Sequence, residues 1–191
     1  MLPQESFISP EEYLAMERAS ETRSQYIDGE IFDMAGASRN HNRISSNLVR
    51  AIGNRLLDSH CHVYSSDMKV KIDRTKYTYP DIVISCEKEK FEDEEEDVLL
   101  NPVIIMEILS DSTEAYDRGK KFAFYQRIPS LREYLLISQH SFRVEKYLRQ
   151  DSRIWRYSAF QETDGIVVLN ALECELPMSE IYRKIIFANK G

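Results

Sequence analysis

The chain has 191 residues, 42% of them hydrophobic and 30% charged, which is the size and composition of one compact globular domain spanning residues 1–191. This composition excludes collagen-like and wholly disordered chains. No apolar run approaches the ~20 residues that a membrane-spanning helix needs, so we expect no membrane partner. The formal net charge of −7 by itself disfavours a nucleic acid partner.

Three elements are predicted in the first 57 residues. A capping-box signal at 9–12 (SPEE) predicts a helix that runs to about Ala19. A β-hairpin is expected at 25–32, with Asp28–Gly29 in its turn. Apolar residues at every fourth position then predict an amphipathic helix over 38–57.

The sequence pattern then changes to alternation, which is typical of strands. We expect one strand over 62–73 and a second over 77–85. They are followed by the acidic segment, residues 87–97, in which eight acidic residues and two lysines give a local charge of −6. The other 180 residues therefore carry only −1. We expect the acidic segment to be a solvated, mobile loop.

The rest of the chain alternates between apolar runs and helical patterns. Residues 102–109 are apolar on both faces except for Glu107, which is typical of a central strand buried on both sides. A helix is expected from Ser112 or Thr113 to about Arg127, and the remaining expected elements are strands at 133–138, 142–149, 153–160 and 165–169 and a helix at 179–187. This order predicts an α/β fold with a mixed central β-sheet flanked by helices.

The three cysteines, Cys61, Cys86 and Cys174, lie far apart and form no CxxC pair. Free thiols in a reducing compartment are the simplest interpretation, because any pairing leaves one cysteine over. The first residues lack the basic and apolar pattern of a secretory signal. We therefore expect a cytoplasmic protein.

Glu107 is the most unusual residue of the expected core. An ionised carboxylate in an apolar strand costs several kcal/mol unless it is compensated, so Glu107 pairs with a buried cation, reaches solvent at a strand end, or belongs to a site. Asp81 follows Pro80 at the start of another apolar run, where a simple turn role is the alternative. If the two strands pair, the two carboxylates align and offer a place for a hard divalent cation.

Lys121 is expected on the helix that follows the Glu107 strand. One interpretation is a solvent-exposed i, i+4 ion pair with Asp117, worth a few tenths of a kcal/mol. The other is that its ammonium reaches back toward Asp81 and Glu107. There it would orient or help deprotonate a metal-bound water, or stabilise charge that grows on a phosphate.

Taken together, these motifs resemble the PD-(D/E)XK nuclease superfamily, which has the restriction-endonuclease-like fold. The runs YIDGEI at 26–31, YPDIV at 79–83, MEILSDST at 106–113 and DRGKKF at 117–122 resemble more closely the Uma-two family. Its members are small bacterial proteins regarded as restriction-endonuclease-like nucleases. The resemblance covers roughly residues 7–137 in order and spacing, and it implies a restriction-endonuclease-like core.

The resemblance implies roles for individual residues. Asp81 and Glu107 match the two acidic metal ligands, and the backbone carbonyl of Ile108 would be a third oxygen ligand for Mg²⁺ (or Mn²⁺). The position of the superfamily's usual strand lysine is occupied by Leu109. Lys121 would therefore serve as a lysine supplied from the helix.

Three further residues are weighed as site candidates. Lys120 competes with Lys121, but it lies ~100° away around the helix axis. Glu30 matches a motif position and would complete the metal site through a water, or pair with a base in the hairpin. His41 would act as a general base or a phosphate contact, or would bond to the backbone in the first turn of its helix.

The leading hypothesis is a Mg²⁺-dependent endonuclease that hydrolyses phosphodiester bonds of DNA. Its expected catalytic residues are Asp81, Glu107, Lys121, Glu30 and His41. A homodimer is expected by analogy, because cutting both strands of a duplex favours two-fold symmetry. The alternative is a catalytically weak or inactive module of the same fold that binds nucleic acid or a protein partner, since the net charge and the missing strand lysine both disfavour turnover.

Overall fold

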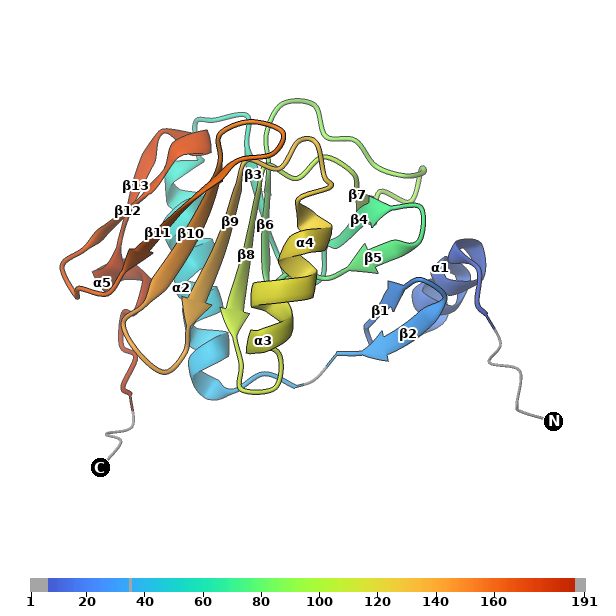
Figure 1. Cartoon of the computed structure of the whole chain (residues 1–191), viewed down its shortest axis with the longest axis horizontal. Coiled ribbons are helices and arrows are strands. Elements are labelled where there is room, and N and C mark those ends of the chain that lie inside the picture. The colour runs from blue at the N-terminus through green and yellow to red at the C-terminus, as the bar shows by residue number, and fades with distance from the viewer. Residues whose placement is uncertain (1–6, 35, 188–191) are drawn as a thin grey trace.

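The structure is a computed structural model and describes residues 7–34 and 36–187. Its centre is a six-stranded mixed sheet, here called the large sheet (Figure 1). Strand β8 runs parallel to β9 and antiparallel to β6, and the other neighbouring pairs are antiparallel. In spatial order its strands are β11 (Trp155–Phe160), β10 (Val144–Arg149), β9 (Glu133–Ser138), β8 (Ile104–Leu109), β6 (Ile82–Ser85) and β3 (His62–Ser65). The predicted mixed central sheet is confirmed.

Two smaller sheets stand at opposite ends of the large one (Figure 1). The five-stranded small sheet has the order β2 (Glu30–Asp33), β1 (Ser24–Ile27), β5 (Lys76–Thr78), β4 (Lys69–Asp73) and β7 (Val98–Leu99). At the other end, β12 (Ile166–Leu169) pairs with β13 (Cys174–Pro177). The helices are α1 (Pro10–Ala19), α2 (Arg39–Arg55), α3 (Glu114–Tyr116), the π-helix η1 (Asp117–Lys121), α4 (Phe122–Tyr125), the 3₁₀-helix η2 (Asn170–Leu172) and α5 (Met178–Ile181).

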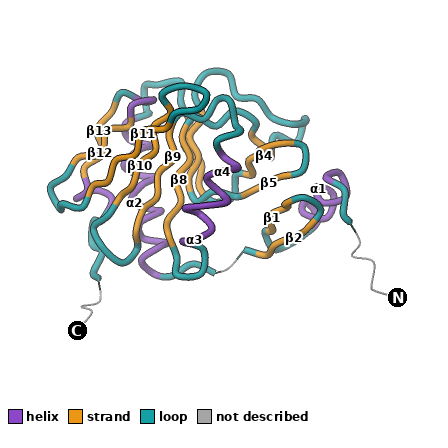
Figure 2. Tube along the Cα trace, viewed as in Figure 1, coloured by secondary structure: helices purple, strands orange, loops and turns teal. Residues whose placement is uncertain are grey.

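Helices cover both faces of the large sheet, with α2 on one face and α3–η1–α4 on the other (Figure 2). Successive side chains of a strand point to opposite faces. Even-numbered residues of β8 therefore pack in the core cluster beneath α2. Odd-numbered Ile105 and Leu109 pack with Tyr125 of α4. Glu107 lies between these two residues, so its carboxylate belongs to the face covered by α3–η1–α4.

The expected local signals at the N-terminal end are confirmed. Ser9 and Glu12 form both bonds of the capping box at the start of α1. Asp28 and Gly29 both have positive φ, 51° and 96°, as a two-residue hairpin turn between β1 and β2 requires. Helix α2 begins after Ser38, whose Oγ accepts the His41 N–H.

Two strand predictions were wrong, because each expected strand is divided between two sheets. The run over 62–73 turns at 66–68, so β3 pairs in the large sheet and β4 in the small one. The run over 77–85 is interrupted at 79–81, where Pro80 has no N–H for a ladder, and it becomes β5 and β6. The alternation of apolar residues changes phase between Val63 and Met68 and is interrupted at Pro80 and Asp81. The pattern marks both interruptions but does not reveal the change of sheet.

The two helices predicted in the second half of the chain were correct in position and wrong in extent. The helix expected to reach Arg127 ends at Tyr125 and contains the π-helical turn η1 at its centre. The helix expected over 179–187 is the short α5, which ends at Ile181. No helix of the described residues combines the length and apolarity needed to cross a bilayer.

The acidic segment is a largely exposed loop, as expected, and it is also anchored to α1 and the small sheet. Arg18 donates to both Asp93 and Asp97, with N–O distances of 2.7–3.0 Å. Asp97 also pairs with Lys69, which is only 1% exposed. The segment leads directly into β7, which pairs in parallel with β4. Cations of α1 and the small sheet thus hold this concentration of negative charge.

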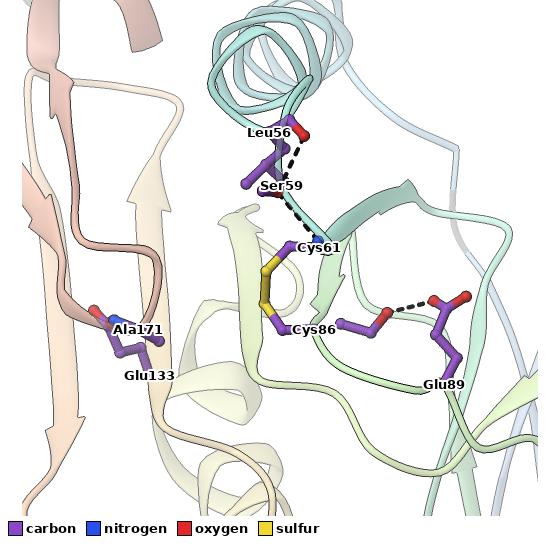
Figure 3. Close-up of a disulfide and its surroundings, with 8 residues drawn as sticks. Leu56, Ser59, Cys61, Cys86, Glu89, Glu133 and Ala171 are labelled. Carbon is purple, nitrogen blue, oxygen red and sulfur yellow. Dashed lines mark hydrogen bonds between the residues drawn. A yellow bond between two sulfur atoms is a disulfide. The ribbon is translucent and has the colours of Figure 1, made fainter.

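The expectation of three free thiols was wrong, because Cys61 and Cys86 form a disulfide (Figure 3). Cys61 precedes β3 and Cys86 follows β6, and the antiparallel pairing of His62 with Ser85 brings the two cysteines face to face. The two cysteines are 25 residues apart in the sequence, and the pairing of β3 with β6 brings them together. Their spacing in the sequence therefore does not predict the disulfide. Cys174 remains free and partly buried.

Candidate functional site

Asp81 lies opposite Glu107 at the junction of the two sheets. Ile82 pairs with Met106 and Val83 with Ile105, and one further step of this register aligns Asp81 with Glu107. The Asp81 carboxylate accepts the backbone N–H of Ile108 at 2.7 Å. The alignment of two acidic residues that the sequence predicts is therefore present.

Glu107 forms a buried ion pair with Lys121. Lys121 Nζ lies 2.8 Å from Oε1 of Glu107, and the two side chains are 6% and 4% exposed. Lys121 Nζ also lies 3.4 Å from Oδ1 of Asp117, one helical turn earlier. The expected i, i+4 pair exists, but it is buried rather than solvated. Lys120 is exposed, which distinguishes the two competing lysines.

The charges at this pair perturb one another. Burial raises the pKa of the Glu107 carboxyl above its ordinary value, with Lys121 opposing the shift. Burial alone would lower the pKa of Lys121, but the carboxylates of Glu107 and Asp117 raise it above its ordinary value. Lys121 is thus held as an ammonium in the core, and this positive charge offsets the cost of burying acidic side chains.

Tyr125 is part of the site, although a tyrosine on a helix is as compatible with simple packing in the core. Its hydroxyl donates to Oε1 of Glu107 at 2.8 Å, and the side chain is fully buried. Tyr125 follows Lys121 by one turn, as Lys121 follows Asp117. This spacing of four residues is the signal in the sequence that identifies the face directed at Glu107.

His41 joins the site from α2. Its Nε2 lies 3.2 Å from each carboxylate oxygen of Asp81. Its backbone N–H bonds to Oγ of Ser38, while its ring bonds to Asp81 and not to the backbone. The role of His41 as a general base or phosphate contact stays a prediction. Two buried polar atoms around the site have no hydrogen-bond partner in the described residues, namely Nδ1 of His41 and Oδ1 of Asp117.

Glu30 is the expected site residue that the structure does not bring into this cluster. It is exposed at the start of β2, in the small sheet. Within residues 7–34 and 36–187, its side chain makes no hydrogen bond or ion pair with the other four candidates. Figure 1 shows β2 beside α1, away from β8.

The donor set fits a magnesium ion held by two carboxylates. Asp81 and Glu107 supply hard oxygen ligands from neighbouring strands, and Mg²⁺ commonly binds through one or two carboxylates while keeping several waters. Nδ1 of His41, which is buried and has no hydrogen-bond partner in the described residues, is the kind of polar atom that a bound water would satisfy. Among the described residues, no three His, Cys, Asp or Glu side chains are grouped to hold a metal ion. Ile108 contributes its N–H to Asp81, and the ligand role of its carbonyl stays a prediction.

Comparisons with known proteins concern the family and the fold. The family model Uma2, described as "Putative restriction endonuclease", matches residues 10–179. Two uncharacterized proteins of Synechocystis sp. are similar to the chain. The protein sll1609 is 41% identical over 145 residues, which are 75% of this chain and 82% of its own, and slr1290 is 35% identical over 181 residues, 94% of each.

A solved structure shares the fold. It is described as "a putative nuclease belonging to DUF820 from Anabaena variabilis", and it superposes with a TM-score of 0.77 over 94% of this chain and 99% of its own. The sequences are 20% identical. At this identity the likeness concerns the fold alone.

Proposed function

This chain belongs to the Uma2 family, and we propose that it is a metal-dependent endonuclease that hydrolyses phosphodiester bonds of DNA. The observation that carries the proposal is the alignment of Asp81 with Glu107 while the Lys121 ammonium reaches Glu107 from the covering helix. Two opposed carboxylates and one buried cation are the residue types that metal-assisted phosphate hydrolysis requires.

In this proposal Asp81 and Glu107 hold Mg²⁺ or Mn²⁺. When bound, the ion would supply Lewis-acid stabilisation of the charge on the phosphoryl oxygens. The Ile108 N–H and the His41 ring fix the orientation of Asp81 from two sides. They act as positioning groups, because their contacts are made to the carboxylate.

Lys121 is the proposed catalytic residue from the helix. Its ammonium is held by Glu107 and Asp117, so its position is set before substrate binds. There it would orient the attacking water and donate to oxygens on which negative charge grows. Tyr125 positions Glu107 through its hydroxyl.

The test is nicking of supercoiled plasmid DNA by purified protein with Mg²⁺ or Mn²⁺. Asp81→Asn and Lys121→Met should each reduce nicking by at least a hundredfold. Lys120→Met is the matched control, since it removes the same charge one residue away on the exposed side of the helix. It should retain nicking close to that of the unsubstituted chain.

Equal nicking by all four proteins would identify a contaminating nuclease and contradict the proposal. The folded state of Lys121→Met must be checked by circular dichroism, because the substitution leaves Glu107 without its cation. Asp81→Asn keeps the size and hydrogen-bonding capacity of the side chain. It therefore provides an independent variant if Lys121→Met does not fold.

A second candidate function is a nuclease-fold binding module without turnover. The observation in its favour is that Oε1 of Glu107 already accepts from both Lys121 and Tyr125, as in a purely structural buried ion pair. In that case no nicking is found with either metal. Asp81→Asn then leaves DNA binding unchanged.

A further inference from the structure

A basic groove of about 710 Å³ runs along the outer side of α2. One wall is α2 and the other is the turn that follows α5. Its lining contains five cationic side chains, two asparagines and a serine, and no acidic residue. The cations are Arg39, Arg43, Arg50, Arg183 and Lys184. In a chain of net charge −7, such a concentration of positive charge is unexpected from composition.

Hydrogen bonds join the two walls of the groove. The buried amide of Asn47 donates to the carbonyls of Ile181 and Arg183, both at 2.9 Å. Arg43 donates to the carbonyl of Lys184 at 2.8 Å. Lys184 has a backbone φ of 60°, a conformation that residues other than glycine rarely adopt. The turn is therefore fixed to the helix, and both walls present their cations along one groove.

These cations are available to a ligand. None of the five forms an ion pair with a carboxylate in the part of the chain that the structure describes. Arg43 and Arg50 each use one donor within the protein, to Lys184 and Asn47. Arg39 and Arg183 are exposed, and neither side chain donates a hydrogen bond within the described residues. The guanidinium groups thus keep most of their donors for an anion, and arginine is well suited to bind phosphate.

The shape of the groove favours an extended polyanion over a single phosphate. Arg39 and Arg50 are eleven positions apart on one helix, about 16 Å along its axis. Each strand of a DNA duplex carries one phosphate per about 3.4 Å of its axis. Cations spread along such a length match several successive phosphates, whereas a site for one phosphate would gather them at a point.

The groove also lies near the candidate site. Arg39 is two residues before His41, which contacts Asp81, so the groove begins at the end of α2 that reaches the site. The acidic segment leads into β7 at the other end of the molecule (Figure 1). Charge is therefore separated across the protein, and a polyanion is attracted to the α2 side and repelled from the β7 side.

We propose that this groove binds the phosphate backbone of DNA on one side of the bond that is cut. The proposal rests on the proposed nuclease function for the identity of the polyanion. It assigns substrate affinity to Arg39, Arg43, Arg50, Arg183 and Lys184, which lie outside the cluster around Glu107.

The test measures binding of a labelled 30-base-pair DNA duplex in EDTA, so that cleavage does not occur, at several salt concentrations. Arg39→Ala/Arg183→Ala should weaken binding at least tenfold and reduce the slope of log affinity against log salt by roughly 2, because about one ion is released per phosphate contact. Arg153→Ala/Arg156→Ala is the matched control, since it removes the same charge at exposed positions on and beside β11. It should keep the affinity and the slope of the unsubstituted chain.

The outcomes separate this proposal from the nuclease proposal. If the groove variant and the control bind alike, or the unsubstituted chain does not bind DNA, the groove proposal is wrong. If the groove variant loses binding while the unsubstituted chain does not nick plasmid, the groove is retained and the nuclease proposal fails. Unchanged thermal midpoints confirm that the variants are folded, and Arg39→Gln alone repeats the test with a single exposed residue.

Discussion

Lys121 on the covering helix and Glu107 on the central strand form a buried ion pair at 2.8 Å, in a layer that is otherwise largely aromatic and aliphatic. Neither charge would be tolerated there alone. The pair therefore fixes the helix over the sheet as well as assembling the candidate site. Stability and site geometry consequently depend on the same two side chains.

Removing the cation of this pair should be strongly destabilising. Lys121→Met leaves the Glu107 carboxylate buried without its charge partner, which costs about 3–5 kcal/mol of unfolding free energy. Urea denaturation followed by circular dichroism measures this change. Lys120→Met, on the exposed side, should change stability by less than about 0.5 kcal/mol. Similar losses in the two variants would show that the pair is not formed.

Tyr125→Phe tests the hydroxyl that donates to Glu107. It removes one hydrogen bond to a buried charged group and leaves the ring in place, so we expect a loss of about 1.5–3 kcal/mol. Tyr116→Phe is the control, because its hydroxyl makes no hydrogen bond within the described residues. A Tyr125→Phe protein as stable as this control would contradict the contact at 2.8 Å.

The anchoring of the acidic segment should depend on pH. The hydrogen bonds from Arg18 lower the pKa of Asp97 below its ordinary value, and the charge of Lys69 lowers it further. A carboxyl with a lowered pKa in the folded state contributes stability that is fully present above its ordinary pKa and is lost as the pH falls through the lowered value. The thermal midpoint of unfolding should therefore decrease once the pH is lowered below about 4.

Asp97→Asn provides the matching experiment. It should lower the thermal midpoint at pH 7, and the difference from the unsubstituted chain should shrink as the pH falls below 4. Glu94→Gln alters an exposed side chain of the same segment that makes no hydrogen bond or ion pair in the described residues, so it should have little effect at any pH. A difference that stays constant down to pH 2 would disprove the electrostatic origin.

The disulfide should make stability sensitive to reductants. Breaking the Cys61–Cys86 bond releases a loop of 25 residues, and such crosslinks typically contribute about 2–4 kcal/mol. Dithiothreitol should lower the unfolding free energy by this amount, while Cys174→Ser should not. Thiol titration of the unfolded chain should give one free thiol before reduction and three after it. Three thiols before reduction would restore the expectation made from the sequence.

The fold was predictable where local chemistry decides the structure. Three features depend only on residues that are close in the sequence, and all three are present. They are the capping box at Ser9, the Asp28–Gly29 turn and the row of apolar residues along α2. The division of 62–73 and 77–85 between two sheets was not predictable, because it depends on long-range pairing. The disulfide depends on the same long-range pairing, so it was not predictable from the sequence either.

For the site, residue type was a better guide than position in an element. Asp81 and Glu107 were identifiable because a carboxylate is costly in an apolar strand. Tyr125 was not identifiable, because a tyrosine on an amphipathic helix is compatible with simple packing. Only the packing of α4 over β8 directs its hydroxyl to Glu107. The basic groove required the turn after α5 to dock against α2, which no segment of sequence encodes alone.

At Gly119, the π-helical turn η1 is sensitive to the number of residues rather than to the identity of the side chain. A β-carbon added at Gly119 would meet no atom within 4 Å, so Gly119→Ala is accommodated. Deleting the same residue would rotate everything before it by about 100° relative to α4, because each helical residue turns the chain by that angle. The residues before the deletion would then lose their present contacts with the sheet, among them the bond from the Tyr134 hydroxyl to the Asp117 carbonyl. Natural variation in this family should therefore include substitutions at Gly119 and exclude single-residue insertions and deletions in this turn.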